Sequence, residues 1–153
     1  MSPQDKVLLT RGRLGSRLES LSSMKSELVL KFEFKASHSL AGYEAPHSHL
    51  WKLETAIGGE VIDGKIADMM EVRAQIDCIL GHLTATFLNE NPYVGQAVRK
   101  APTCETLGVF FKDKLEEVLS VFRKGNSSIY LGSVMVTICS DEGLEIGGVR
   151  LTV

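Results

Sequence analysis

The sequence predicts an α+β domain in which two helices cover one face of a four-stranded antiparallel sheet. Two segments with alternating apolar residues come first, two segments of helical periodicity follow, and two segments rich in Val, Ile, Leu and Thr end the chain. The predicted order is therefore strand, strand, helix, helix, strand, strand. Strands grouped around a helical pair are typical of this fold class.

The four strands are expected over residues 27–38, 47–57, 128–139 and 144–153. The first two have the period of two of a half-buried strand, with apolar and charged residues on opposite faces. Residues 39–46 form the loop between them. The last two segments are rich in Val, Ile, Leu and Thr, which predicts a closing hairpin.

The apolar period changes to three and four residues from Asp68 onward, which predicts an amphipathic helix with Asp68 as its N-cap. The helix is expected to continue until the segment 89–92 and to be followed by a loop to Pro102. Thr103 begins the second helix, which Gly125 ends.

Composition excludes several classes of protein. The chain has 153 residues, of which 44% are hydrophobic and 24% charged, as in one globular domain. A net charge of -2 offers no basic surface for nucleic acid, and no apolar stretch approaches the ~18 residues of a membrane span. Three cysteines and no continuous apolar leader favour a reducing compartment. A cytoplasmic protein that binds neither nucleic acid nor a membrane is expected.

The N-terminal residues 1–26 contain little pattern that would form a core, beyond one short apolar run. They are expected to be an extension that is disordered or attached to the surface. The single domain is expected over residues 27–153.

Three of the four histidines predict a site for a divalent metal, zinc in the first place. His47 and His49 stand two residues apart on a predicted strand, so both side chains leave the same face. His38 ends the neighbouring strand, so all three imidazoles are able to meet at one end of the sheet. Three neutral imidazoles suit zinc and leave a fourth position open, which is typical of catalytic sites. The alternative is three histidines that are close only in sequence.

Five runs of the sequence resemble the 6-pyruvoyltetrahydropterin synthase family, which includes the bacterial 6-carboxytetrahydropterin synthases of queuosine biosynthesis. They follow in the family's order with similar spacing: KFEFKASHSL, HSHLWKLE, DGKIADMMEVR, FLNENP and APTCETLG. The resemblance implies the tunnelling fold (T-fold), in which subunits join their sheets into a barrel as a homotrimer or a homohexamer. It also implies a zinc-dependent lyase whose small-molecule substrate is 7,8-dihydroneopterin triphosphate or a related pterin.

The resemblance implies site residues as well. The family's zinc ligands correspond to His38, His47 and His49. Its Pro-Thr-x-Glu motif, which lies at the pterin pocket between subunits, makes Thr103 and Glu105 candidate substrate contacts. A threonine N-cap followed by an acidic residue also stabilises a helix start without any ligand, and this alternative stays open.

Three departures from the family concern catalysis. The family's catalytic cysteine, a few residues before the His-x-His motif, has no counterpart here. Thr84 and Ala85 stand where the family has its catalytic Asp-His pair, and Ile138 stands where a glutamate anchors the pterin. Glu44, three residues before His47, is the candidate base, because some relatives use a glutamate in place of the cysteine. The alternative is a solvated loop carboxylate.

Two further residues are weaker candidates. His82 would replace the missing histidine if the helix end carries an insertion, and is otherwise structural or exposed. Cys104 lies within the pocket motif, and a helix start is able to lower the pKa of a thiol. Cys78 and Cys139 are expected to be small core residues.

Two alternatives to the lyase stay open. One is a divergent enzyme of the same fold that acts on another pterin or a purine-like substrate, which the loss of the glutamate at Ile138 favours. The other is a non-catalytic relative that binds metal and ligand, which the missing cysteine and Asp-His pair favour.

Overall fold

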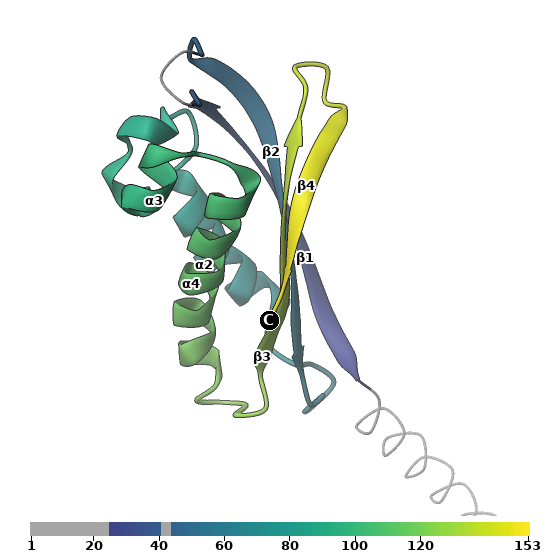
Figure 1. The fold of residues 1–153 in the computed structure, drawn as a ribbon. Coiled ribbons are helices and arrows are strands. Elements are labelled where there is room, and N and C mark those ends of the chain that lie inside the picture. Colours follow the sequence, from purple (N-terminus) through teal and green to yellow (C-terminus); the bar gives the residue numbers. More distant parts are fainter. Residues whose placement is uncertain (1–24, 41–43) are drawn as a thin grey trace, which may run out of the picture.

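The computed structural model describes residues 25–40 and 44–153, which form one four-stranded antiparallel sheet with helices on one side (Figure 1). The strands lie in the sheet in the order of the chain: β1 (Ser26–His38), β2 (His47–Gly59), β3 (Tyr130–Cys139) and β4 (Glu145–Thr152). The predicted fold class is confirmed. The predicted N-terminal extension lies outside the described residues, apart from its last two.

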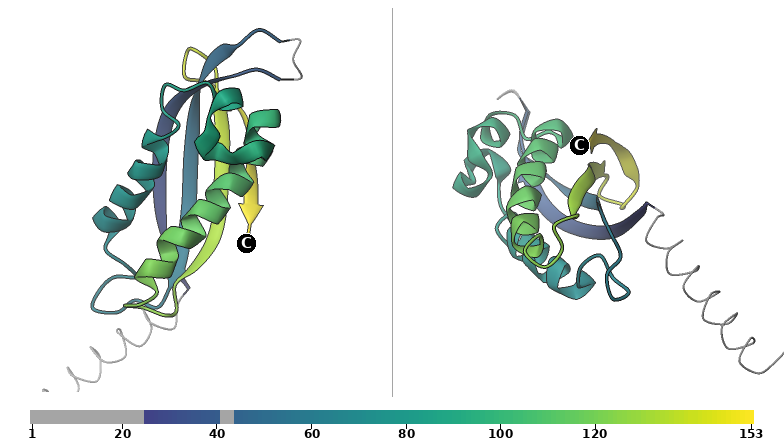
Figure 2. Two further views of the ribbon diagram at one scale, coloured as in Figure 1. Left: turned by 90° about the vertical axis from the view of Figure 1, so that its left-hand side faces the viewer. Right: turned by 90° about the horizontal axis from the view of Figure 1, so that it is seen from below.

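Two main helices, α2 (Met69–Gly81) and α4 (Cys104–Phe122), cover the same face of the sheet (Figure 2). Both begin at the predicted N-caps, Asp68 and Thr103, whose side chains accept hydrogen bonds from backbone N–H groups of the first turn. Within the described part of the chain, no helix combines the length and apolar character that crossing a membrane requires.

The first helix is shorter than the sequence predicted, because it ends at Gly81 and not near residue 89. Ala85 then takes a φ of 60°, and its N–H donates to the Lys35 carbonyl oxygen over 2.7 Å, so the chain turns toward β1. Leu83 and Leu88 are fully buried beyond the helix end. Their burial continues the apolar spacing, which explains the wrong boundary.

The connection between α2 and α4 is more ordered than the expected loop. It contains two 3₁₀ turns, η1 (Leu88–Glu90) and η2 (Pro92–Val94), and the short helix α3 (Gly95–Lys100). Leu88, Val94 and Val98 of this connection are buried in the core. The connection therefore packs as part of the domain.

The core lies between the sheet and the helices, and aromatic residues dominate it near one end of β1 and β2. Phe34 stacks on Trp51 with 6.3 Å between ring centroids, and Phe111 of α4 meets Phe34 edge-on at 5.9 Å. Trp51 is completely buried and donates its indole N–H to the Ala36 carbonyl oxygen over 3.1 Å. These contacts fix the two strands directly below the histidines.

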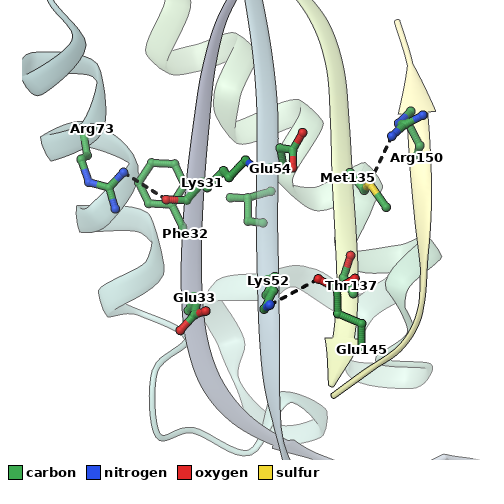
Figure 3. A pocket seen from close by; sticks show the side chains of 11 residues that line it. Lys31, Phe32, Glu33, Lys52, Glu54, Arg73, Met135, Thr137, Glu145 and Arg150 are labelled. Atoms are coloured by element: carbon green, nitrogen blue, oxygen red, sulfur yellow. Dashed lines mark hydrogen bonds and ion pairs between the residues drawn. The ribbon is translucent and has the colours of Figure 1, made fainter. Parts of the chain in front are cut away.

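The opposite face of the sheet is open and charged (Figure 3). Lys31 stands opposite Glu54, and Glu33 stands opposite Lys52, so each charge has a partner of opposite sign on the next strand. These side chains line a trough of about 720 Å³. None of the predicted metal ligands, catalytic residues or substrate contacts lines this trough.

Candidate metal centre

The three histidines converge at the end of the sheet where β1 ends and β2 begins, uppermost in Figure 1. His38 stands directly opposite His47 in the antiparallel register, and His49 stands opposite Ala36. Their ring centroids are 4.6 Å apart for His38 and His47, 4.7 Å for His47 and His49, and 5.1 Å for His38 and His49. One nitrogen of each ring lies within 4.8 Å of the others. We call these residues the histidine cluster.

Backbone carbonyl groups orient all three rings in the same way. A carbonyl oxygen only accepts hydrogen bonds, so each Nδ1 carries the proton and each Nε2 keeps its lone pair in the neutral ring. This orientation is the usual one for histidines that bind a metal through Nε2. The Nδ1–oxygen distances are 2.8 Å from His38 to Pro102, 2.9 Å from His47 to Ala45 and 2.9 Å from His49 to Cys139.

The facing nitrogens of His38 and His47 are suited to binding a cation. Their Nε2 atoms are 2.9 Å apart, and with both Nδ1 atoms protonated the two lone pairs point at each other. Burial lowers the pKa of His38, as do the neighbouring histidines, and this outweighs the Pro102 hydrogen bond, which raises it. A shared proton is therefore disfavoured at neutral pH. A tetrahedral zinc ion separates two nitrogen ligands by about 3.3 Å, which this arrangement fits after a small shift.

The histidine cluster is closed on one side and open on the other. His38 is only 4% exposed, whereas His47 and His49 are half-buried. The ring of Trp51 lies beneath, with centroids 5.1 Å from His38 and 6.2 Å from His49. A metal ion held here would keep a coordination position toward solvent, where a water molecule or a substrate oxygen could bind.

Glu44, the predicted base, lies beside the histidine cluster. Its Oε1 atom is 3.8 Å from Nε2 of His47, and its Oε2 atom accepts the N–H of Leu40 over 3.1 Å. The side chain is half-exposed, which leaves it accessible to a ligand. The geometry is compatible with proton transfer, and the catalytic role stays a prediction.

His82 and the residues that follow it lie apart from the cluster. His82 forms the C-cap of α2, is exposed, and stacks on Tyr93 with 4.1 Å between ring centroids. Its ring is not part of the group of converging nitrogens. Thr84 and Ala85 are exposed in the turn after α2. A catalytic role for His82 stays a prediction.

The Pro-Thr-x-Glu motif forms a helix cap and also touches the cluster. Thr103 accepts the N–H of Thr106 over 3.2 Å, and the Thr106 hydroxyl accepts the N–H of Thr103 over 3.1 Å, which completes a capping box. Glu105 is exposed in the first turn. The carbonyl of Pro102 holds His38, so the start of α4 lies at the histidine cluster. Substrate contacts by Thr103 and Glu105 stay predictions.

The cysteines differ from expectation at two positions. Burial, together with the negative charge of Glu105, raises the pKa of Cys104 to about 11, so its thiol is neutral at pH 7. The lowered pKa considered for a helix start is therefore wrong for this residue. Cys139 is buried as expected, whereas Cys78 is exposed and not a core residue.

Comparisons with known proteins agree with the fold. The sequence profile of the family described as 6-pyruvoyl tetrahydropterin synthase matches residues 27–139. A protein of Pyrococcus furiosus named dihydroneopterin monophosphate aldolase is 22% identical over 98 residues, which are 63% of this chain and 80% of that protein.

Two solved structures are similar in fold. The 6-pyruvoyl tetrahydropterin synthase of Caenorhabditis elegans is 15% identical, with a TM-score of 0.63 over 85% of this chain and 96% of the other. The Plasmodium vivax enzyme, solved with a catalytic glutamate replaced by alanine, is 15% identical, with a TM-score of 0.61 over 86% of this chain and 100% of the other. At this identity the likeness shows the fold alone, but the profile covers most of the described domain. The chain belongs to the 6-pyruvoyl tetrahydropterin synthase family.

Proposed function

We propose that this protein is a zinc-dependent lyase that acts on the phosphorylated side chain of a 7,8-dihydroneopterin. The observation that carries the proposal is the histidine cluster, whose Nε2 atoms converge while backbone carbonyls hold every Nδ1. Family membership supports the choice of a pterin over other small molecules. When bound, the metal would supply Lewis acidity toward the oxygen atoms of the substrate side chain.

Three side chains of the protein have proposed roles in the reaction: one as the base and two as contacts of the pterin ring. Glu44 is the proposed base, because its carboxylate lies 3.8 Å from His47 and so reaches a ligand at the cluster. The Plasmodium vivax relative, which has a catalytic glutamate, supports a glutamate in this role. Glu105, exposed at the start of α4, is the proposed acceptor for N–H groups of the pterin ring, and Thr103 is its proposed neighbour in the pocket.

Two reactions are compatible with one base beside one metal. Removal of a carbon-bound proton leads to loss of triphosphate from dihydroneopterin triphosphate, as in the synthases of this family. Removal of a hydroxyl proton leads to cleavage of a carbon–carbon bond, as in an aldolase. The name of the Pyrococcus furiosus relative favours the second reaction and a monophosphate substrate. Ile138, an apolar residue at the strand position of the family's anchoring glutamate, also supports a substrate held differently.

Metal-loaded protein incubated separately with the triphosphate and the monophosphate of 7,8-dihydroneopterin tests the proposal. Products are identified by mass spectrometry: free triphosphate marks elimination, and a two-carbon aldehyde phosphate marks bond cleavage. We expect His47→Ala to lose both metal and turnover. We expect Glu44→Gln to keep the metal and to lose about 10²- to 10⁴-fold in kcat. A zinc-loaded protein that converts neither compound would contradict the proposal and favour the non-catalytic alternative.

The assembly is part of the proposal. Strands β1 and β4 are the two edges of the sheet. On β1, Lys35 and Ser37 already bond to the segment 85–87, so the part of β1 that precedes Lys35 is the part offered for pairing. Ile146, on β4, is 64% exposed. Pairing of β4 with β1 of a neighbouring copy would close both edges, as in a homotrimer or a homohexamer. Light scattering on the purified protein gives the subunit number, and a monomer at micromolar concentration would contradict this part.

A further inference from the structure

Asn89 of η1 binds the residue that follows His38. Its side-chain nitrogen donates to the Ser39 carbonyl oxygen over 2.8 Å, and its side-chain oxygen accepts the Ser39 N–H over 2.9 Å. One carboxamide thus satisfies both backbone polar groups of one residue, as a neighbouring strand would do. Ser39 is 8% exposed, so leaving these groups without partners would be costly.

Ser39 and Leu40 in turn hold Glu44. The Ser39 hydroxyl donates to the carbonyl oxygen of Glu44 over 2.6 Å, and the Leu40 N–H donates to its Oε2 atom over 3.1 Å. The other carboxylate oxygen faces His47. A continuous series of hydrogen bonds therefore leads from Asn89 to the carboxylate beside the histidine cluster.

Asn89 is itself held by a rigid part of the fold. Leu88, its neighbour, is completely buried, and Ser37 of β1 donates its N–H to Thr86 over 2.9 Å, which binds this segment to the strand. Glu44, in contrast, is a half-exposed residue on a connection between strands. A side chain in that position has many rotamers unless other groups restrict it.

We propose that Asn89 is a positioning residue that holds the Glu44 carboxylate beside the histidine cluster by fixing Ser39 and Leu40. Its contribution to turnover rests on the proposed function. Its contribution to the position of Glu44 depends only on the hydrogen bonds described above. Misplacement of a base by about 1 Å is enough to cost on the order of 10²-fold in rate.

The test compares Asn89→Ala with Asn126→Ala in the metal-loaded protein. Asn126 serves as the control, since it is likewise a carboxamide that donates to backbone carbonyls, those of Glu60 and Ile66, at the opposite end of β2. It is buried, whereas Asn89 is half-buried. Amide exchange at Leu40, measured by nuclear magnetic resonance, reports whether Glu44 still accepts that proton. We expect exchange at Leu40 to be about 10-fold faster or more in Asn89→Ala and unchanged in Asn126→Ala.

Kinetics and metal content complete the experiment. With whichever dihydroneopterin phosphate is converted, we expect Asn89→Ala to lose about 10- to 100-fold in kcat at unchanged metal content. Asn126→Ala should keep the wild-type kcat, even where its melting temperature falls by a similar amount. If Asn89→Ala does not fold, Asn89→Asp takes its place: it keeps the acceptor for the Ser39 N–H and replaces the donor with a carboxylate oxygen that the Ser39 carbonyl repels.

The outcomes separate the two proposals. Unchanged exchange at Leu40 in a folded Asn89 variant overturns the positioning role, and so does an equal increase in Asn126→Ala. Where a pterin phosphate is converted, faster exchange at Leu40 confined to the Asn89 variant supports the positioning role only together with a lowered kcat. If neither pterin phosphate is a substrate and the proposed function fails, the exchange result alone decides the positioning role. A kcat that Glu44→Gln lowers and Asn89→Ala leaves unchanged overturns the positioning role and keeps the proposed function.

Discussion

The two faces of the sheet differ in which ionisable residues stand opposite each other on neighbouring strands. On the open face, Lys31 stands opposite Glu54 and Glu33 opposite Lys52, so these four charges each face a charge of opposite sign. At the covered end of the sheet, His38 stands opposite His47, and two groups of the same kind face each other. Pairs of opposite charge neutralise each other, whereas the facing lone pairs of His38 and His47 are suited to binding a cation between them. The comparison therefore favours the histidine cluster over the charged trough as the candidate site.

Removal of the metal from the histidine cluster is expected to have the largest effect on stability. A metal that binds only the folded protein adds about 4 kcal/mol at a free concentration a thousand times Kd, so a chelator should lower the Tm by about 8–16 °C. Calorimetry with and without chelator measures the change. The control is Lys31→Ala on the open face, which should show the same chelator effect as the wild type. A Tm that does not respond to chelator would count against a metal at the cluster.

Acidification should affect the cluster next. The pKa of His38 is lowered, first of all by burial, so the unfolded chain binds its proton at a higher pH than the folded chain. Stability without metal should therefore be highest above about pH 6.5 and should decrease as the pH falls through the lowered folded pKa. Denaturant titrations of the metal-free protein between pH 5 and 8 measure this dependence. His38→Gln should flatten it, and an unchanged pH dependence in that variant would assign the effect to other groups.

The rate of cysteine alkylation tests the surroundings of Cys104, at the start of α4. Because the pKa of Cys104 is raised to about 11, alkylation at pH 7 should be slow and should accelerate about tenfold for each pH unit up to that value. Cys78, exposed on the outer side of α2, should be modified first. Peptide mass spectrometry after timed alkylation distinguishes the two sites. Preferential modification of Cys104 at pH 7 would mean that its thiolate is stabilised after all.

The smallest effect is expected on the open face. A double-mutant cycle between Lys52 and Glu145, whose Nζ and Oε1 atoms are 3.3 Å apart, should give a coupling free energy below about 1 kcal/mol, because exposed ion pairs gain little. The single variants should leave metal content and kcat unchanged. A variant in this trough that abolishes turnover would show that the open face also takes part in function.

The sequence was sufficient to predict the strands and the histidines, because both depend on spacing alone. Alternation over residues 27–38 and the separation of two residues between His47 and His49 already determine which side chains share a face. The end of α2 was not predictable in the same way, since Leu83 continues the helical spacing while the backbone has left the helix. The spacing of apolar residues predicts which positions are buried, but it does not predict which hydrogen bonds the backbone makes.

The hydrogen-bond partners of the three histidines could not be predicted from the sequence, for a related reason. Pro102, Ala45 and Cys139 act on the histidines through their carbonyl oxygens, which every residue type possesses. No sequence pattern distinguishes such an acceptor. Asn89 was visible only as part of a family motif, and its contact with Ser39 requires the turn at Ala85, which tertiary structure determines.

The position of Trp51 allows metal binding to be followed by the intrinsic fluorescence of the protein. It is the chain's only tryptophan, it has no exposed surface, and its indole ring lies against two of the three histidines. Its emission should therefore be that of an indole shielded from water, and cobalt or copper at the histidines should quench it, whereas zinc should not. Competition between these ions can be followed by intrinsic fluorescence, without a label and on the timescale of stopped-flow mixing.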